Sequence, residues 1–163
     1  MRPSWDDTFM LLAKVWSMRS TCTARVAVGA VLVNPECQVI ASGYNGAPRT
    51  MEHCDEVGCK IEYGENFSHC ICAIHAEENA ILQCAVNGVS PRGCTLYVTH
   101  SPCYRCALRF IQVGIARVRF GMVYGKDYKK VAKLLNDHGI SLFGYTNLRG
   151  YFIVDGKEII NDE

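Results

Sequence analysis

Residues 75–106, HAEENAILQCAVNGVSPRGCTLYVTHSPCYRC, decide the fold of this chain. The first part predicts a helix over about 75–87 that stops at Gly88, since glycine is the usual residue just beyond a helix C-terminus. The β-branched and apolar run 94–99 predicts a strand, and a second helix is expected over 103–113. Helices that alternate with strands in this way indicate parallel strands joined by right-handed crossovers.

The same patterns extend to both sides of this stretch. Toward the C-terminus we expect a strand over 116–123, a helix over 127–138 and a strand over 140–145. Toward the N-terminus we expect an amphipathic helix from Ser4, with Asp7 completing a capping box, to about Ser20. A strand over 26–33 and its antiparallel partner over 39–44 follow, whereas 45–74 lack periodicity and are expected to form a functional loop region.

These elements predict an α/β fold, a three-layer αβα sandwich around a mixed five-stranded sheet. An antiparallel N-terminal hairpin is followed in this sheet by parallel strands. We expect residues 1–163 to form a single domain with its core over about 4–145. The tail, 146–163, is expected to form a small hairpin that turns at Asp155-Gly156.

Composition narrows the functional classes. The 163 residues carry a net charge of +1 without basic runs, which argues against a nucleic-acid partner. The chain has no apolar run long enough to span a membrane, and its N-terminus lacks the apolar core of a signal peptide, so we expect a cytoplasmic protein. Ten cysteines are many for a reducing compartment, and metal binding is the better explanation for the clustered ones.

Two short motifs carry the chemistry: His75-Ala76-Glu77 and Pro102-Cys103-Tyr104-Arg105-Cys106. Cys103 and Cys106 lie three residues apart, so on a helix they face the same side, and a helix N-terminus favours their thiolate form. With His75 they would supply three zinc ligands and leave the fourth position for water, the arrangement of a catalytic site. Glu77 could then serve as the proton shuttle. The alternative is a structural zinc site closed by a fourth cysteine or histidine.

Together the two motifs match the signature of zinc-dependent nucleobase deaminases, and the chain resembles the deoxycytidylate deaminases of that superfamily. The resemblance covers roughly 4–145, and 71–74 depart from the pattern. It rests on Ser20-Thr21-Cys22, Val28-Gly29-Ala30-Val31, Gly43-Tyr44-Asn45-Gly46-Ala47-Pro48, His53-Cys54, Gly58-Cys59, His69-Cys70, His75-Ala76-Glu77-Glu78-Asn79-Ala80-Ile81 and Tyr97-Val98-Thr99-His100-Ser101-Pro102-Cys103.

The resemblance implies that the protein converts dCMP to dUMP and ammonia. It assigns Asn45 to the sugar hydroxyl, although Asn45-Gly46 is also an ordinary turn signal. Ser101, Arg105 and Tyr124 are the other candidate substrate contacts, with Arg25 and Lys126 as further cations for the phosphate. The resemblance also implies a second, structural zinc. Its candidate ligands are Cys22, Cys54, Cys59 and Cys70, with His53 and His69 as substitutes.

The family further implies a homohexamer that dCTP activates and dTTP inhibits. Tyr44 and Gly46 would belong to the effector site, where Arg25, Arg49 or Lys60 would offset the triphosphate charge and Mg²⁺ could accompany it. Three alternatives stay open: a nucleic-acid deaminase of the tRNA adenosine type, a deaminase of dCTP or free cytidine, and a zinc-stabilised binding module without activity.

Overall fold

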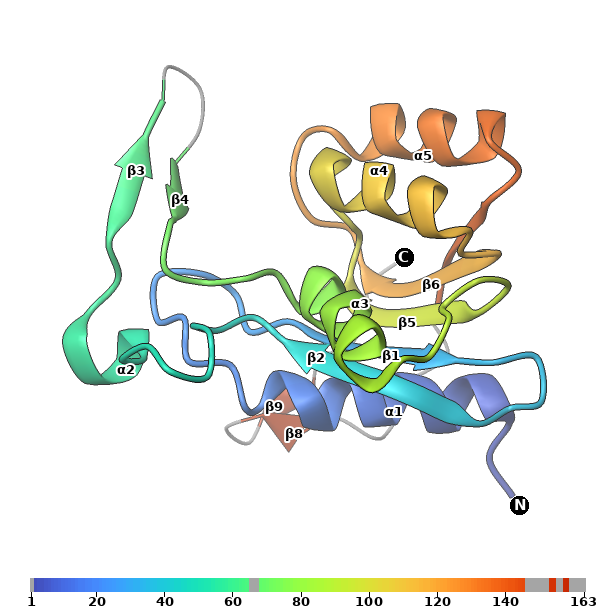
Figure 1. The fold of residues 1–163 in the computed structure, drawn as a ribbon, viewed down its shortest axis with the longest axis horizontal. Helices are drawn as coiled ribbons and strands as arrows, with labels where there is room; N and C mark the ends of the chain where they lie inside the picture. Colours follow the sequence, from blue (N-terminus) through green and yellow to red (C-terminus); the bar gives the residue numbers. More distant parts are fainter. Residues whose placement is uncertain (1, 65–67, 146–152, 155–156, 159–163) are drawn as a thin grey trace.

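The computed structural model describes residues 2–64, 68–145, 153–154 and 157–158. Its centre is a five-stranded sheet in the order β2-β1-β5-β6-β7 (Figure 1). The strands are β1 (Gly29–Val33), β2 (Val39–Tyr44), β5 (Thr95–His100), β6 (Arg117–Met122) and β7 (Ser141–Gly144). β1 is antiparallel to both β2 and β5, and β5, β6 and β7 are parallel to one another. The predicted mixed sheet is confirmed.

Helices cover both faces of this sheet (Figure 1). α1 (Trp5–Ser17) packs on one face, and α3 (Ala76–Asn87), α4 (Tyr104–Val113) and α5 (Tyr128–Asp137) lie on the other. Successive side chains of a strand point to opposite faces. Val31 therefore joins the α1 core with Phe9, whereas Leu32 joins the core formed with Phe110 of α4. β1 is buried on both faces, as its β-branched sequence predicts.

Two predicted boundaries move for reasons visible in the backbone. The strand predicted over 26–33 begins only at Gly29, because the Asn45 side chain binds the Val28 N–H at 2.8 Å and the Val26 carbonyl at 3.1 Å. The N-terminal helix ends at Ser17 rather than near Ser20, although its predicted capping box is present. Among the described residues, no helix has the length and apolar character needed to cross a membrane.

The segment 45–74 is more ordered than predicted. It contains α2 (Cys54–Val57), β3 (Ile61–Tyr63) and β4 (Ser68–Cys70), and β3 pairs with β4 as an arm that stands away from the main sheet (Figure 1). Elements of three or four residues are too short to show a periodic pattern. In the tail, β8 (Ile153–Val154) pairs with β9 (Lys157–Glu158) as the predicted hairpin requires, whereas its turn, 155–156, lies outside the described residues.

The start of α3 lies directly against β2. A Cβ atom added to Gly43 would be 2.4 Å from the Ala76 carbonyl oxygen and 2.7 Å from the Ala80 nitrogen. Only glycine permits so close an approach of two backbones. The first turn of α3, which carries the His-x-Glu motif, is thereby placed against the sheet.

Candidate active site and metal centres

His75 and Cys103 occupy equivalent positions, the N-caps of α3 and α4. N-cap side chains usually accept a hydrogen bond from the helix, and serine, threonine, aspartate and asparagine are preferred there. Neither His75 nor Cys103 makes such a bond. Their side chains face each other instead. Pro102 lies directly before the N-cap of α4.

His75 Nδ1 lies 3.5 Å from Cys103 Sγ and 3.5 Å from Cys106 Sγ. In a tetrahedral zinc site with bonds of about 2.0–2.1 Å to nitrogen and 2.3 Å to sulfur, the two ligand atoms are about 3.5 Å apart. The three side chains therefore fit a zinc ion without rearrangement. The fourth position of such a site would stay open for water.

The electrostatics of this cluster favour a thiolate. A hydrogen bond from the Cys106 thiol, helped by His75, lowers the pKa of Cys103 to about 4. The hydrogen bond to Cys103, together with burial, holds the pKa of Cys106 well above its usual value. The bond to Cys103 raises the pKa of His75. The cluster thus holds protons that a bound cation would displace.

Glu77 lies in the first turn of α3, two residues from His75, and is only 5% exposed. Burial raises the pKa of its carboxyl group to about 7. A carboxyl group with this pKa can both accept and release a proton near neutral pH, as a general acid–base requires.

Four cysteines form a second cluster at the base of the β3–β4 arm. The distance between Cys22 Sγ and Cys59 Sγ is 3.8 Å and that between Cys54 Sγ and Cys70 Sγ is 3.6 Å. All four sulfur atoms lie within 4.8 Å of one another. Sulfur atoms around a tetrahedral zinc, at about 2.3 Å from it, are about 3.8 Å apart, so this group fits a closed four-sulfur site.

The two histidines considered as substitute ligands lie outside that cluster. His53 Nδ1 is 3.4 Å from the Thr21 hydroxyl, and His69 Nε2 is 3.3 Å from the Glu62 carboxylate. The four cysteines of the second cluster, like the three residues of the first, come from segments far apart in sequence.

The four predicted substrate contacts differ in how firmly they are held. Asn45 is 7% exposed, and its amide binds the backbone of Val26 and Val28 rather than forming a turn. The Ser101 hydroxyl binds both backbone groups of Tyr124. The Tyr124 ring lies at the surface, and Arg105 is exposed in the first turn of α4.

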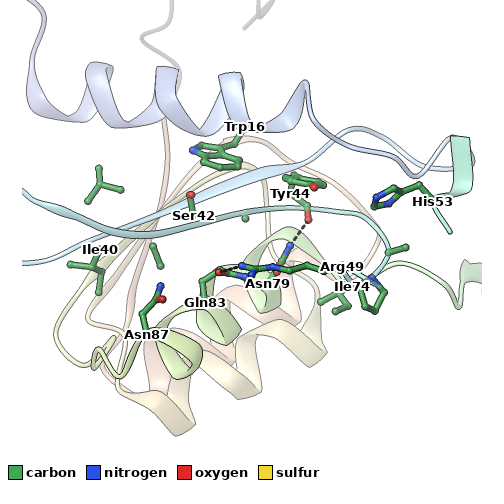
Figure 2. Close-up of a pocket in the computed structure, with 15 residues that line it drawn as sticks. Trp16, Ile40, Ser42, Tyr44, Arg49, His53, Ile74, Asn79, Gln83 and Asn87 are labelled. Atoms are coloured by element: carbon green, nitrogen blue, oxygen red, sulfur yellow. Dashed lines mark hydrogen bonds between the residues drawn. The ribbon is translucent and has the colours of Figure 1, made fainter. Parts of the chain in front are cut away.

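Two of the predicted effector residues line a cavity of about 540 Å³ along the edge strand β2, with Trp16 of α1 on one side of the strand and Gln83 of α3 on the other (Figure 2). They are Tyr44 and Arg49. The Arg49 guanidinium donates to Gln83 at 2.9 Å, and the Tyr44 ring stacks on Trp16 at 6.2 Å between ring centroids. Both interactions keep polar and aromatic groups at the cavity wall.

Sequence reasoning missed several residues of this cavity. Trp16 contributes to the lining from the helix predicted as amphipathic. Asn79, Gln83 and Asn87 line the cavity from α3. Their four-residue spacing is a polar stripe on one helix face and was a usable signal.

Arg25 and Gly46 do not line the cavity. The Arg25 guanidinium donates to the Ser68 carbonyl and, at 2.8 Å, to the Ser68 hydroxyl, so it ties β4 to the loop before β1. Gly46 forms an antiparallel bridge with Ile74, the residue before His75. The first contact joins the loop before β1 to β4, and the second joins the residues after β2 to the segment before His75; neither forms an effector site by itself.

The His-x-Glu and Pro-Cys-x-x-Cys motifs, which this fold brings together at two helix N-termini, are the signature of the zinc-dependent nucleobase deaminases, the class that this fold and site define. The chain belongs to the cytidine and deoxycytidylate deaminase family, whose zinc-binding region matches residues 3–122.

Individual relatives agree with this assignment. The deoxycytidylate deaminase of Saccharomyces cerevisiae is 41% identical over 90% of this chain, and that of Mycobacterium phage D29 is 37% identical over 77%. The chain spans 47% of the yeast protein and 98% of the phage protein. The dCMP deaminase of cyanophage S-TIM5, solved in complex with dCMP and dUMP, superposes with a TM-score of 0.74 at 29% identity, covering 89% of this chain and 99% of that protein.

Proposed function

We propose that this protein hydrolyses dCMP to dUMP and ammonia. The observation that carries the proposal is the spacing of His75, Cys103 and Cys106, which fits a three-ligand zinc site beside the buried Glu77. The relatives named deoxycytidylate deaminase, and the solved dCMP and dUMP complex of the phage enzyme, support the choice of substrate.

Each residue of the site has a distinct part in the proposed reaction. A zinc ion held by His75, Cys103 and Cys106 would supply a water molecule of lowered pKa at neutral pH. Glu77 takes up a proton from water and delivers it to N3 of the cytosine. It then takes a second proton from the hydroxyl group added at C4 and passes it to the amino group, which leaves as the C4 carbonyl forms. Overall, one water molecule is consumed and ammonia leaves from C4. The pKa of Glu77, raised by burial, suits a group that both accepts and donates.

The remaining features are proposed with this activity. Cys22, Cys54, Cys59 and Cys70 would hold a second, closed zinc that anchors the β3–β4 arm. Asn45, Arg105 and Tyr124 would contact the nucleotide. Residues 1–163 would act as one domain of a cytoplasmic homohexamer whose product feeds dTMP synthesis.

Regulation by dCTP and dTTP is proposed at the cavity along β2. The cavity offers an aromatic pair, Trp16 and Tyr44, and a cation, Arg49, which suit a nucleobase and a phosphate group. Arg25 is already bound to Ser68 and is the weaker effector candidate. Mg²⁺ would have to come with the triphosphate.

An assay of ammonia release tests the activity. The purified protein is incubated separately with dCMP, deoxycytidine, cytidine, dCTP and a tRNA that carries the adenosine target. Release from dCMP at the highest kcat/KM supports the proposal. Release only from tRNA or from a nucleoside would replace it with the corresponding alternative, and release from none would leave a binding module.

A further inference from the structure

Ser101 is held in a way that conflicts with a role as a phosphate ligand. It is 4% exposed at the end of β5, directly before Pro102 and Cys103. Its hydroxyl accepts a hydrogen bond from the Tyr124 N–H at 2.7 Å and donates one to the Tyr124 carbonyl at 3.1 Å. A serine hydroxyl has a single proton to donate. While that proton is bound to Tyr124, it is not available to a phosphate oxygen.

The same contacts fix the backbone of Tyr124 on both sides of its Cα atom. The Ser101 N–H also donates to the Met122 carbonyl at 2.7 Å, which continues the parallel pairing of β5 with β6 beyond their last register pair. Tyr124 is therefore attached to the turn that leads into Cys103. The carboxyl ends of adjacent parallel strands are where ligands bind in open α/β sheets.

The side chain of Tyr124 is held from a second direction. The His100 ring meets it edge-on, with centroids 5.8 Å apart and an interplanar angle of 81°. His100 is itself 8% exposed, and its Nδ1 lies 3.0 Å from the Thr99 hydroxyl, which accepts the Gly29 N–H at 3.2 Å. An edge-to-face aromatic contact restricts the ring. With 45% of Tyr124 exposed, the ring stays accessible to a ligand.

We infer that Ser101 is a positioning residue, whose hydroxyl holds Tyr124 as a fixed wall for the substrate at the entrance to the His75–Cys103–Cys106 site. The inference depends on the proposed function in one respect, namely that the ligand beside Tyr124 is a nucleotide. Ser101 would influence substrate binding through Tyr124, without touching the substrate and without contributing to metal binding.

A double-mutant cycle tests this inference through kinetics. In the otherwise unchanged protein, Ser101→Ala should lower kcat/KM for dCMP about fivefold to tenfold, mostly through KM, since roughly one net hydrogen bond is lost. Zinc content should be unchanged. In a Tyr124→Ala background, the same serine substitution should change kcat/KM by less than about twofold, because the ring through which Ser101 acts is gone even though the backbone groups that it binds remain. An equal loss in both backgrounds would show that Ser101 acts independently of Tyr124 and would overturn the inference.

Ser17→Ala is the matched control. Ser17 is also buried, and its hydroxyl donates to the Lys14 carbonyl at 2.6 Å within α1. The variant should lower thermal stability to a similar degree and leave KM unchanged. A KM increase as large as that of Ser101→Ala would show that general destabilisation explains both results.

A second readout does not depend on catalysis. The protein is labelled with 3-fluorotyrosine, and the Tyr124 signal is assigned by its loss in Tyr124→Phe. Ser101→Ala should shift and narrow this ¹⁹F signal, because the ring gains freedom, whereas Ser17→Ala should not. An unchanged signal in Ser101→Ala overturns the inference. Failure of the unsubstituted protein to deaminate dCMP would instead count against the proposed function, and the ¹⁹F result would still decide the positioning role.

Discussion

His75 Nδ1 and Cys103 Sγ lie 3.5 Å apart, although 28 positions separate the two residues. Each is the N-cap of its helix, and each helix begins at the same end of the sheet as the other. A residue that leaves its own helix uncapped gives up about 0.5–2 kcal/mol of stabilisation. Two helices lack this stabilisation at positions that face each other, which indicates that the His75 and Cys103 side chains are placed for a ligand.

Glu77→Gln should abolish most of the activity and keep the metal. The amide preserves the shape of the side chain but cannot carry a proton, and the loss of a general acid–base costs about 10²–10⁴-fold in rate. Steady-state kinetics with dCMP and elemental analysis of the same sample measure both quantities. Glu78→Gln is the control, because the next carboxylate pairs with Arg109 at 2.9 Å and has no assigned part in the reaction. Near-normal turnover of Glu77→Gln would remove the residue from the mechanism.

The two cysteine clusters should bind two zinc ions with different ligand sets. Elemental analysis should give about two zinc ions per chain. After substitution with Co²⁺, a four-sulfur site should show stronger thiolate-to-metal charge transfer than a site with one nitrogen and two sulfurs. Cys103→Ala should remove only the weaker signal and all activity, whereas Cys54→Ser should remove only the stronger one and lower the melting temperature.

Cys84→Ala is the control for both variants, since Cys84 is 2% exposed in the core and belongs to neither cluster. It should lose some stability and no metal. One zinc ion per chain, with a stoichiometry that Cys54→Ser does not alter, would contradict the second site.

Gly43→Ala should disturb the active site from outside it. The added methyl group would lie 2.4 Å from the Ala76 carbonyl oxygen, so α3 must move away from β2. Overpacking of this kind costs about 1–3 kcal/mol, and the shift would carry His75 and Glu77 with it. We expect a lower melting temperature together with weaker retention of zinc against a chelator. Ser42→Ala, one residue earlier on β2, should retain zinc as the unsubstituted protein does; equal retention by both variants would refute the link.

The sequence predicts most of the fold because its elements are long, periodic and well bounded. The helix that starts after His75 and the one that starts after Cys103 both end at glycines with left-handed backbone, Gly88 and Gly114, as their positions indicate. The arm between Cys54 and Cys70 was not predictable in the same way. Its elements are too short to show a periodic pattern. Secondary-structure propensities also take no account of the order that a cluster of four cysteines adds.

Part of the candidate site could also be predicted from the sequence. The ligand motifs are local in sequence, so His75, Cys103 and Cys106 could be found without knowing the fold. The partners of Ser101 and Asn45 could not, because a hydroxyl or an amide can bind a substrate or a distant backbone equally well. In the structure both side chains are hydrogen-bonded to backbone groups, and the contact of Asn45 with the nucleotide stays a prediction.

The phosphate group should contribute to recognition. A charge-assisted hydrogen bond is worth about 1.5–3 kcal/mol, so kcat/KM for dCMP should exceed that for deoxycytidine by at least about tenfold. Arg105→Ala should reduce this ratio toward one, since Arg105 is exposed in the first turn of α4 beside the ligand pair Cys103 and Cys106. Arg117→Ala, an exposed arginine at the opposite end of β6, should leave the ratio unchanged. Equal kcat/KM for the nucleoside and the nucleotide would indicate a nucleoside deaminase.

Effector control should depend on the cavity along β2. A triphosphate there would lie against Tyr44 and Arg49. Tyr44 directly precedes Asn45, and the following residue, Gly46, forms the bridge with Ile74, which directly precedes His75. An effector shifts activity only if it binds two states of the enzyme unequally, with a coupling of about 1–3 kcal/mol.

We expect a sigmoidal response to dCMP that becomes hyperbolic with dCTP and is suppressed by dTTP below saturation. Arg49→Ala should weaken both effects about tenfold in effector concentration and leave kcat at saturating dCMP unchanged, because it removes an exposed cation that binds Gln83 at the cavity wall. Arg92→Ala, whose side chain packs beside Gly114 and does not line the cavity, should retain the response of the unsubstituted protein. Hyperbolic kinetics indifferent to both triphosphates, in protein shown by light scattering to be oligomeric, would show that these residues only shape the cavity.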